Sequence, residues 1–282
     1  MYKSVVIPLD GSRFAEAAIP YGIALARRLS FKVKLLSVVE NQSPHFRIEA
    51  EKYLVRTIIG IKQFLDTSDT SKNPVAFRSR VLIETAVLNG SPAEQITEYT
   101  NSGSLKLLVM ATHGRSGIGR WTIGSVADKV VRTTTRQPTV LIRCRGAQPK
   151  VRIAKGLKKI LVPLDGSMLS SAIISYISEI ARLFDSELRL LQVVPENGSI
   201  FKNAENYLTD LCDGLKAQGY DASHEVRIGS PAETIINVAE KLKADMVAMS
   251  TRGQGGFYPW VLGSVASKII NGGTTPLMLI KE

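Results

Sequence analysis

The chain has 282 residues, the length of about two ordinary domains. A composition that is 44% hydrophobic and 22% charged is typical of a folded globular protein and excludes general disorder. No apolar run approaches the roughly 18 residues that span a bilayer, and the N-terminus lacks a signal-peptide pattern, so we expect a soluble, cytoplasmic protein without a membrane partner. Cys144 and Cys212 lie far apart, with no CxxC motif or Cys/His cluster, so we expect neither a disulfide framework nor a zinc site.

The net charge of +11 falls entirely within residues 1–150, and the rest of the chain has equal numbers of acidic and basic residues. A basic half of this kind attracts phosphates, nucleic acid or an anionic surface. No zinc-finger, helix-turn-helix or RNP-type pattern accompanies the charge, and few aromatic residues lie among the basic ones. We therefore interpret the charge first as a solvated face and disfavour nucleic acid as a partner.

Four sequence blocks recur in the same order. They are VVIPLDGS at 5–12 and ILVPLDGS at 160–167, LLSVVE at 35–40 and LLQVVP at 190–195, GSPAEQI at 90–96 and GSPAETI at 229–235, and GSVADKVV at 124–131 and GSVASKII at 263–270. The first two pairs are shifted by 155 residues and the last two by 139, so the first copy has 16 additional residues between Glu40 and Gly90. The chain is therefore a tandem duplication. We divide it into domains at 1–145 and 156–282, joined by a basic linker at 146–155.

Each copy alternates short apolar runs, which predict buried strands, with segments of helical periodicity. The predicted strands are 4–9, 33–39, 105–111 and 139–143, then 159–164, 188–194, 245–250 and 277–281, with weaker third strands at 78–83 and 223–228; the helices predicted in the first copy are 15–29, 49–65, 92–100 and 124–134. Pro20 should kink the first helix, whereas the second copy has Ser175 there. This alternation predicts parallel βαβ units with right-handed crossovers. The expected fold is two tandem doubly wound α/β sandwich domains, each with a mainly parallel five-stranded sheet.

In a doubly wound sheet, ligands bind beyond the carboxyl ends of the strands, where the strand order reverses. In both copies the first strand ends in Pro-Leu-Asp-Gly-Ser, beginning at Pro8 and at Pro163. Asp10 and Asp165 should therefore lie at the carboxyl edge of the sheet, just before a helix. A turn with a helix N-cap explains the same residues, since Asp, Gly and Ser all favour such positions. Taken alone, this motif leaves both interpretations open.

The fourth strand of each copy leads into a loop that contains glycine. The loops begin Ala111-Thr112-His113-Gly114 and Ser250-Thr251-Arg252-Gly253, and after nine further residues come Gly124-Ser125 and Gly263-Ser264. Glycine lets backbone N–H groups approach phosphate oxygens, and a serine at a helix start adds a hydroxyl group and the positive end of the helix dipole. The pattern predicts an anion cradle. It is not a Walker A loop, because Arg120 and Trp121 stand in place of its Lys and Ser/Thr, and no GxGxxG follows either first strand.

These residues resemble those of the universal stress protein (UspA-like) family, and the resemblance covers nearly the whole chain, twice. ATP-binding members carry G-x2-G-x9-G-[S/T] after the fourth strand, and the last three elements are present in both copies. Ala111 and Ser250 replace the first glycine, and both are small. The resemblance implies an adenine nucleotide alpha hydrolase-like fold and ATP, with or without Mg²⁺, in each domain. It also implies an intramolecular pseudo-dimer through the last strands, and leaves a homodimer of the whole chain open.

The resemblance also implies roles for individual residues. Asp10 or Asp165 would orient the ribose or a phosphate-bound metal, and the backbone of Val38 or Val193 would meet adenine. The residues expected to bind ATP are Pro8, Asp10, Val38, Ala111, His113, Gly114, Gly124, Ser125 and Val126, and in the second copy Pro163, Asp165, Val193, Ser250, Arg252, Gly253, Gly263, Ser264 and Val265. No residue is assigned as catalytic or metal-binding, since no Ser/His/Asp or Cys/His pattern is present.

We therefore expect a cytoplasmic stress-response protein that binds ATP or a related adenine nucleotide and acts as a nucleotide-dependent regulator or protective factor. Slow ATP hydrolysis is one alternative, although no base or Lewis acid outside the cradle stands out. A nucleotide-free interaction or structural module of the same fold is another, and the two intact Gly-x9-Gly-Ser strings argue against it. His113, Arg115 and Arg120 give the first loop more positive charge than Arg252 gives the second, so the two sites should differ.

Overall fold

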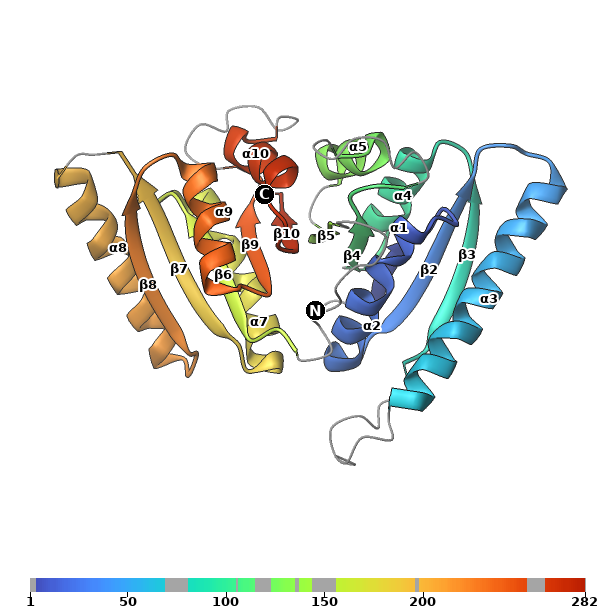
Figure 1. Ribbon diagram of the computed structural model, residues 1–282, viewed down its shortest axis with the longest axis horizontal. Coiled ribbons are helices and arrows are strands. Elements are labelled where there is room, and N and C mark those ends of the chain that lie inside the picture. The colour runs from blue at the N-terminus through green and yellow to red at the C-terminus, as the bar shows by residue number, and fades with distance from the viewer. Residues whose placement is uncertain are drawn as a thin grey trace.

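The computed structural model describes residues 4–68, 81–104, 106–114, 123–134, 137–143, 156–195, 198–252 and 262–281, which form two halves of alternating strands and helices (Figure 1). The first half comprises β1 (Ser4–Pro8), α1 (Arg13–Glu16), α2 (Ala18–Leu29), β2 (Lys32–Val39), α3 (Pro44–Ser68), β3 (Ile83–Asn89), α4 (Pro92–Asn101), β4 (Lys106–Ala111), α5 (Ser125–Thr133) and β5 (Thr139–Ile142). The second half comprises β6 (Lys159–Leu164), α6 (Met168–Ser171), α7 (Ile173–Phe184), β7 (Glu187–Val194), α8 (Gly198–Ala217), β8 (Ala222–Ile228), α9 (Pro231–Leu242), β9 (Met246–Ser250), α10 (Ser264–Gly272) and β10 (Leu277–Ile280).

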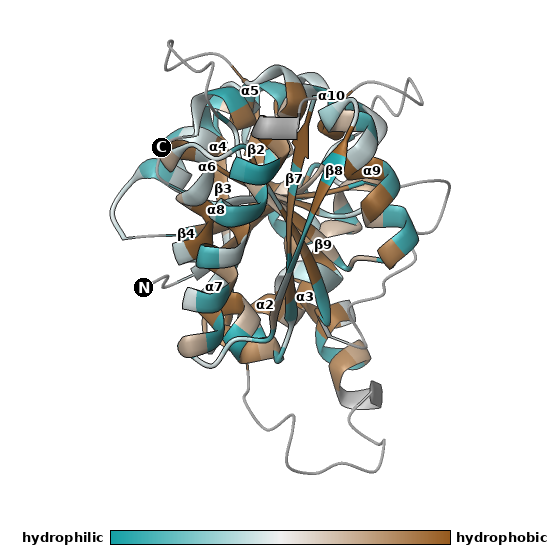
Figure 2. Cartoon of the chain, turned by 90° about the vertical axis from the view of Figure 1, so that its left-hand side faces the viewer, coloured by the Kyte–Doolittle hydropathy of each residue, from teal (hydrophilic) through white to brown (hydrophobic). Residues whose placement is uncertain are grey.

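One sheet runs through both halves, in the order β3-β2-β1-β4-β5-β10-β9-β6-β7-β8. Within each half, all neighbouring strands are parallel. α2 and α3 pack with one hydrophobic cluster and α4 and α5 with another, so both faces of the sheet are covered. In Figure 2 the central strands are largely hydrophobic and the outer side of α8 is largely hydrophilic. The predicted fold of two tandem doubly wound α/β domains is confirmed.

The two halves join through their last strands. β5 and β10 pair antiparallel, with Leu141 opposite Leu277 and Val140 opposite Met278, and every residue of both strands is buried. The pairing that the resemblance implied is thus present within the chain. A second contact brings α2 to α7, where the Arg28 guanidinium lies 5.6 Å from the centre of the Phe184 ring.

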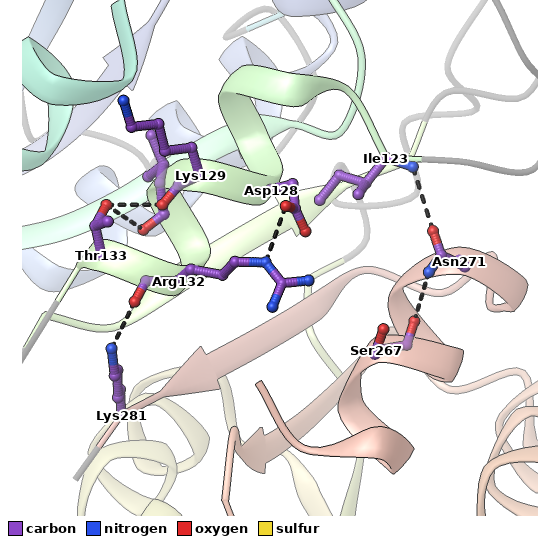
Figure 3. A network of polar contacts seen from close by, with 9 residues as sticks. Ile123, Asp128, Lys129, Arg132, Thr133, Ser267, Asn271 and Lys281 are labelled. Atoms are coloured by element: carbon purple, nitrogen blue, oxygen red, sulfur yellow. Dashed lines mark hydrogen bonds and ion pairs between the residues drawn. The ribbon is translucent and has the colours of Figure 1, made fainter. Parts of the chain in front are cut away.

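Basic side chains that follow these strands reach across to the other half. A guanidinium nitrogen of Arg143, after β5, donates to the carbonyl of Gly273 at 2.7 Å, just beyond α10. Nζ of Lys281, after β10, donates to the carbonyl of Arg132 at the end of α5 (Figure 3). The last carbonyls of a helix lack intrahelical partners and carry the negative end of its dipole, which explains the choice of cations. Each half therefore fixes the end of a helix of the other.

The first helix is divided, but Pro20 is not the cause. α1 and α2 are separated at Ala17, so Pro20 is the third residue of α2, where a backbone N–H has no intrahelical partner to lose. The second half has Ser175 in place of the proline, yet its helix is divided at the equivalent Ala172. The division is therefore independent of Pro20, and the difference between Pro20 and Ser175 does not distinguish the two helices at this point.

The third strand of the first half was placed too early. The sequence pattern put it at 78–83, of which 78–80 lie outside the described residues, whereas β3 is Ile83–Asn89. Most side chains of β3 are half-buried, so it lacks the continuous apolar run that marks its neighbours. All other predicted strands agree with the structure to within one residue, apart from Leu105, which is not described. Among the described helices, none combines the length and the apolarity that a transmembrane segment requires.

Gly22 on α2 offers a test of this packing. A Cβ there would lie 2.4 Å from Cδ1 of Ile7, which is fully buried in β1. Gly22→Ala should therefore destabilise the protein by about 1–2 kcal/mol through overpacking, in spite of the better helix propensity of alanine. Gly60→Ala, on the exposed side of α3 with no atom within 4 Å, is the matched control and should stabilise by about 0.5–1 kcal/mol. Urea unfolding measures both changes, and a shift of the same sign would contradict this packing.

Candidate functional site

Asp10 lies in the turn after β1 and supports the start of α1. Its Oδ1 accepts the backbone N–H of Ser12 at 2.9 Å, and Oγ of Ser12 caps the helix by accepting the N–H of Ala15 at 3.1 Å. In the second half, Oδ1 of Asp165 accepts both the backbone N–H and the hydroxyl of Ser167, at 3.0 and 2.6 Å. The interpretation of this motif as a turn with a helix N-cap is therefore correct: one oxygen of each aspartate holds the turn, and the serine caps the helix.

The second oxygen of Asp10 lies against the glycine loop. A Cβ on Gly114 would be 2.4 Å from Oδ2 of Asp10, so no side chain fits at this position without displacing the carboxylate. The two residues meet because β1 and β4 are neighbours at the point where the strand order reverses. The structure thus brings together the aspartate and the loop glycine that the sequence predicted as parts of one site.

Each loop is closed at its base by a backbone hydrogen bond. The N–H of Gly124 donates to the carbonyl of Thr112 at 2.8 Å, and the N–H of Gly263 to the carbonyl of Thr251 at 2.9 Å. A Cβ would lie 3.1 Å from that carbonyl oxygen at Gly124 and 2.7 Å at Gly263. Both glycines have an ordinary φ, of −63° and −56°. Glycine is therefore required by close backbone approach, more tightly in the second half, and not by a special conformation.

The serines after these glycines begin α5 and α10. Ser125 and Ser264 are exposed, and within the described residues neither helix receives a hydrogen bond from a capping side chain. The first N–H groups of a helix have no partner inside it and carry the positive end of the dipole. Each Gly-Ser pair thus lies at a helix N-terminus, a position that favours an anion.

His113 and Arg252 occupy equivalent positions at the base of the two loops. Nδ1 of His113 lies 2.9 Å from Oγ1 of Thr112, while its buried Nε2 has no hydrogen-bond partner in the described part of the chain. In the second half, Nε of Arg252 and Oγ1 of Thr251 are likewise buried without a described partner. Buried polar atoms in proteins are nearly always paired, so these atoms favour a ligand with hydrogen-bonding groups at this place.

The remaining predicted residues lie at the same edge of the sheet. Pro8, Ala111 and Ser250 end β1, β4 and β9, and Pro163 and Val193 lie next to the ends of β6 and β7, as Val38 does in β2. Val38, Val126, Val193 and Val265 are half-buried against one hydrophobic cluster, which supplies an apolar floor. Gly253 lies outside the described residues, as do Arg115, Arg120 and Trp121.

Two tyrosines that sequence reasoning missed are influenced by the charges of the aspartates. The hydroxyl of Tyr53 on α3 donates to Oε1 of Glu16 at 3.0 Å. Burial, followed by the charges of Glu16 and Asp10, raises the pKa of Tyr53 well above its usual value, so this phenol stays protonated. Burial also raises the pKa of Tyr207 on α8, with Asp165 as the second cause. Their spacing of 154 residues, next to the repeat shift of 155, is the signal that could have found them.

The fold and the site define a tandem pair of doubly wound α/β domains, each with an aspartate turn and a closed glycine loop at the reversal of strand order. The model of the Universal stress protein family matches residues 1–143 and again 156–281. The chain therefore belongs to the universal stress protein family, as the sequence resemblance indicated.

Individual relatives agree with this assignment. The universal stress protein MJ0531 of Methanocaldococcus jannaschii is 31% identical over 140 residues, which cover 44% of this chain and 82% of that protein. Slr1230 of Synechocystis is 20% identical over 300 residues, covering 99% of this chain and 100% of that protein. The solved structure of a universal stress protein from Archaeoglobus fulgidus matches 99% of this chain and 98% of its own, with a TM-score of 0.75 at 18% identity, and so shows the same fold.

The contact between Asp10 and Gly114 can be tested by a double-mutant cycle. Gly114→Ala should destabilise the protein by about 1–3 kcal/mol, because its Cβ would overlap Oδ2 of Asp10. Asp10→Ala alone should cost about 0.5–2 kcal/mol through the lost bond to Ser12. The overlap is absent from the double variant, whose cost should be smaller than the sum of the two. Strictly additive free energies in urea unfolding would contradict the contact.

Proposed function

We propose that this universal stress protein binds an adenine nucleotide, ATP in the first instance, at the carboxyl edge of each half, and acts as a nucleotide-dependent regulator in the cytoplasm. The observation that carries the proposal is the meeting of Asp10 with Gly114, next to a loop that closes on the N-terminus of α5. The same loop closure precedes α10. Nucleotide occupancy would then bias a conformation or a partner surface.

The two ends of a nucleotide would be held by different chemistry. The phosphate oxygens would accept hydrogen bonds from the first N–H groups of α5 or α10 and from the hydroxyl of Ser125 or Ser264. Nε2 of His113 and Nε of Arg252, which have no partner among the described residues, supply further hydrogen-bonding groups at the base of the loops. Adenine would lie over the half-buried valines and meet the backbone of Val38 or Val193.

The aspartates would contact the ribose and any metal ion that accompanies the phosphates. Oδ1 of Asp10 accepts the N–H of Ser12 and Oδ2 lies next to Gly114, so the carboxylate stands at the base of the glycine loop, where it would orient a ribose hydroxyl. In the described ranges, no group of three or more His, Cys, Asp and Glu side chains could hold a metal ion. Mg²⁺ would therefore arrive on the triphosphate, with Asp10 or Asp165 as its nearest protein carboxylate.

Two solved universal stress proteins are complexes with adenine nucleotides, one with cAMP and one, from Archaeoglobus fulgidus, with dAMP. Those ligands belong to those proteins. The proposal for this chain rests on its own aspartates, closed loops and helix N-termini.

The loop glycines provide the decisive variants. Gly124→Val and Gly263→Val should each remove one of two ATP sites, and both together should abolish binding, because the branched side chain would press on Thr112 or Thr251. Single alanine substitutions should distinguish the two sites. A Cβ would lie 2.7 Å from the facing carbonyl oxygen at Gly263 and 3.1 Å from it at Gly124, so Gly263→Ala should lose more ATP affinity than Gly124→Ala. If the steric overlap costs about 1–3 kcal/mol of binding free energy, the affinity should fall roughly 5- to 150-fold.

Titration calorimetry of the full-length variants measures both stoichiometry and affinity. Gly214→Ala on α8, with no atom within 4 Å of its Cβ, is the control and should leave binding unchanged. A folded double-valine variant with wild-type affinity would refute this site. Absence of any nucleotide binding by the wild-type protein would instead favour the nucleotide-free module.

The two sites should also differ in their response to salt. The first half carries the whole net charge of +11, and Arg13 follows its capping serine where the second half has Met168. A positive potential accelerates the capture of a polyanion and is screened by salt. Stopped-flow association should therefore be faster and more salt-sensitive at the first site, measured in Gly263→Val, than at the second, measured in Gly124→Val. Equal rates with equal salt slopes would show that the charge is only a solvated face.

A further inference from the structure

Asn271, in the last turn of α10, bonds to the backbone just before the cradle of the other half. Its Oδ1 accepts the N–H of Ile123 at 3.3 Å, and its Nδ2 donates to the carbonyl of Ser267 at 2.9 Å (Figure 3). The amide is used on both sides, oxygen as acceptor and nitrogen as donor, which fixes its orientation. Gly124 and Ser125 follow Ile123 directly, so the contact falls where the loop of the first half meets α5.

The end of this loop is thus held from two sides. The N–H of Gly124 donates to Thr112 of its own half, and the preceding N–H donates to Asn271 of the other half. Both bonds fix the backbone that leads into the first N–H groups of α5. Those groups are the ones that the phosphates of a nucleotide would take.

The equivalent contact is chemically impossible in the opposite direction. The repeat shift of 139 places Leu262 at the position of Ile123 and Arg132 at the position of Asn271. A guanidinium has donors and no acceptor, so Arg132 cannot receive the N–H of Leu262. Nε of Arg132 instead donates to Asp128 on its own helix at 2.9 Å (Figure 3).

We propose that Asn271 is a positioning residue for the nucleotide site of the first half, supplied by the second half. This inference rests on the proposed function. Asn271 does not touch the ligand; it acts through the backbone of Ile123 and Gly124. The site of the first half is therefore complete only when the second half is docked against it, whereas the site of the second half receives no such bond from Arg132.

Site-resolved NMR on the intact chain tests this role. The amide resonances of Gly124 and Ser125 report ATP binding in the first half, and those of Gly263 and Ser264 report it in the second. Asn271→Ala should speed amide exchange at Ile123 and weaken ATP at the first site by about two- to tenfold, the worth of one hydrogen bond. The second site should keep its affinity, which a general loss of packing would not allow.

Two further variants sharpen the result. Asn271→Asp keeps an acceptor oxygen and should retain most of the protection from amide exchange at Ile123. Arg132→Ala, at the equivalent position of the other half, should change neither the amide exchange at Ile123 nor the ATP affinity of either site. Unaltered exchange at Ile123, unaltered affinity at the first site, or equal losses at both sites in Asn271→Ala would overturn the inference. Wild-type protein in which neither pair of resonances responds to ATP would refute the proposed function itself, whereas a wild-type response that is insensitive to Asn271→Ala refutes only the positioning role.

Discussion

The antiparallel pairing of β5 with β10 is the interaction on which the rest of the molecule depends. Each is a four-residue strand at the end of its own parallel sheet, and each is buried along its whole length. An unpaired edge at this place would leave backbone groups and apolar side chains uncovered. Pairing merges the sheets, and both hydrophobic clusters then contain residues of both halves. The halves are therefore better regarded as one packed body than as two tethered domains.

The same pairing determines where the candidate sites lie. Because β5 and β10 are adjacent, the helices that precede them, α5 and α10, lie side by side where the two halves meet, at the top of the view in Figure 1. Arg143 and Lys281 then reach the carbonyls at the far ends of these helices. Burial, with the charge of Arg252 as a second cause, lowers the pKa of Lys281. α5 and α10 are thus fixed at their C-terminal ends by the opposite half, and their N-termini face the glycine loops of their own half.

Internal repetition made most of this fold predictable. Two copies of one pattern support each other, and the shift of 139 that relates GSPAEQI to GSPAETI also maps β8 onto 83–89, where β3 lies. The third strand was placed too early because most side chains of β3 are only half-buried, and Glu84, Thr85 and Asn89 interrupt its apolar residues. Pro20 lies in the first turn of α2, a position that the sequence pattern of one continuous helix at 15–29 did not reveal.

The candidate site was predictable as far as its motifs are local. The aspartate turn and the Gly-x9-Gly-Ser loop are short strings, and parallel strands bring their ends together. The bond from the hydroxyl of Tyr53 to Glu16 and the bond from Ile123 to the amide of Asn271 join segments that are distant in the sequence, so no local pattern marks them. The sequence also does not show why residue 263 must be glycine, because only the folded chain brings the carbonyl of Thr251 so close that a side chain is excluded.

Joining the two copies in one chain has a consequence for how they can evolve. In a dimer of identical subunits, a twofold axis forces the same residue onto both sides of every contact, so a substitution that suits one side is imposed on the other. Here the equivalent positions hold Asn271 and Arg132, one bonded across the interface and the other to Asp128 on its own helix. Covalent fusion has thus released the interface from symmetry, and each copy is free to acquire a division of labour that a homodimer could not encode.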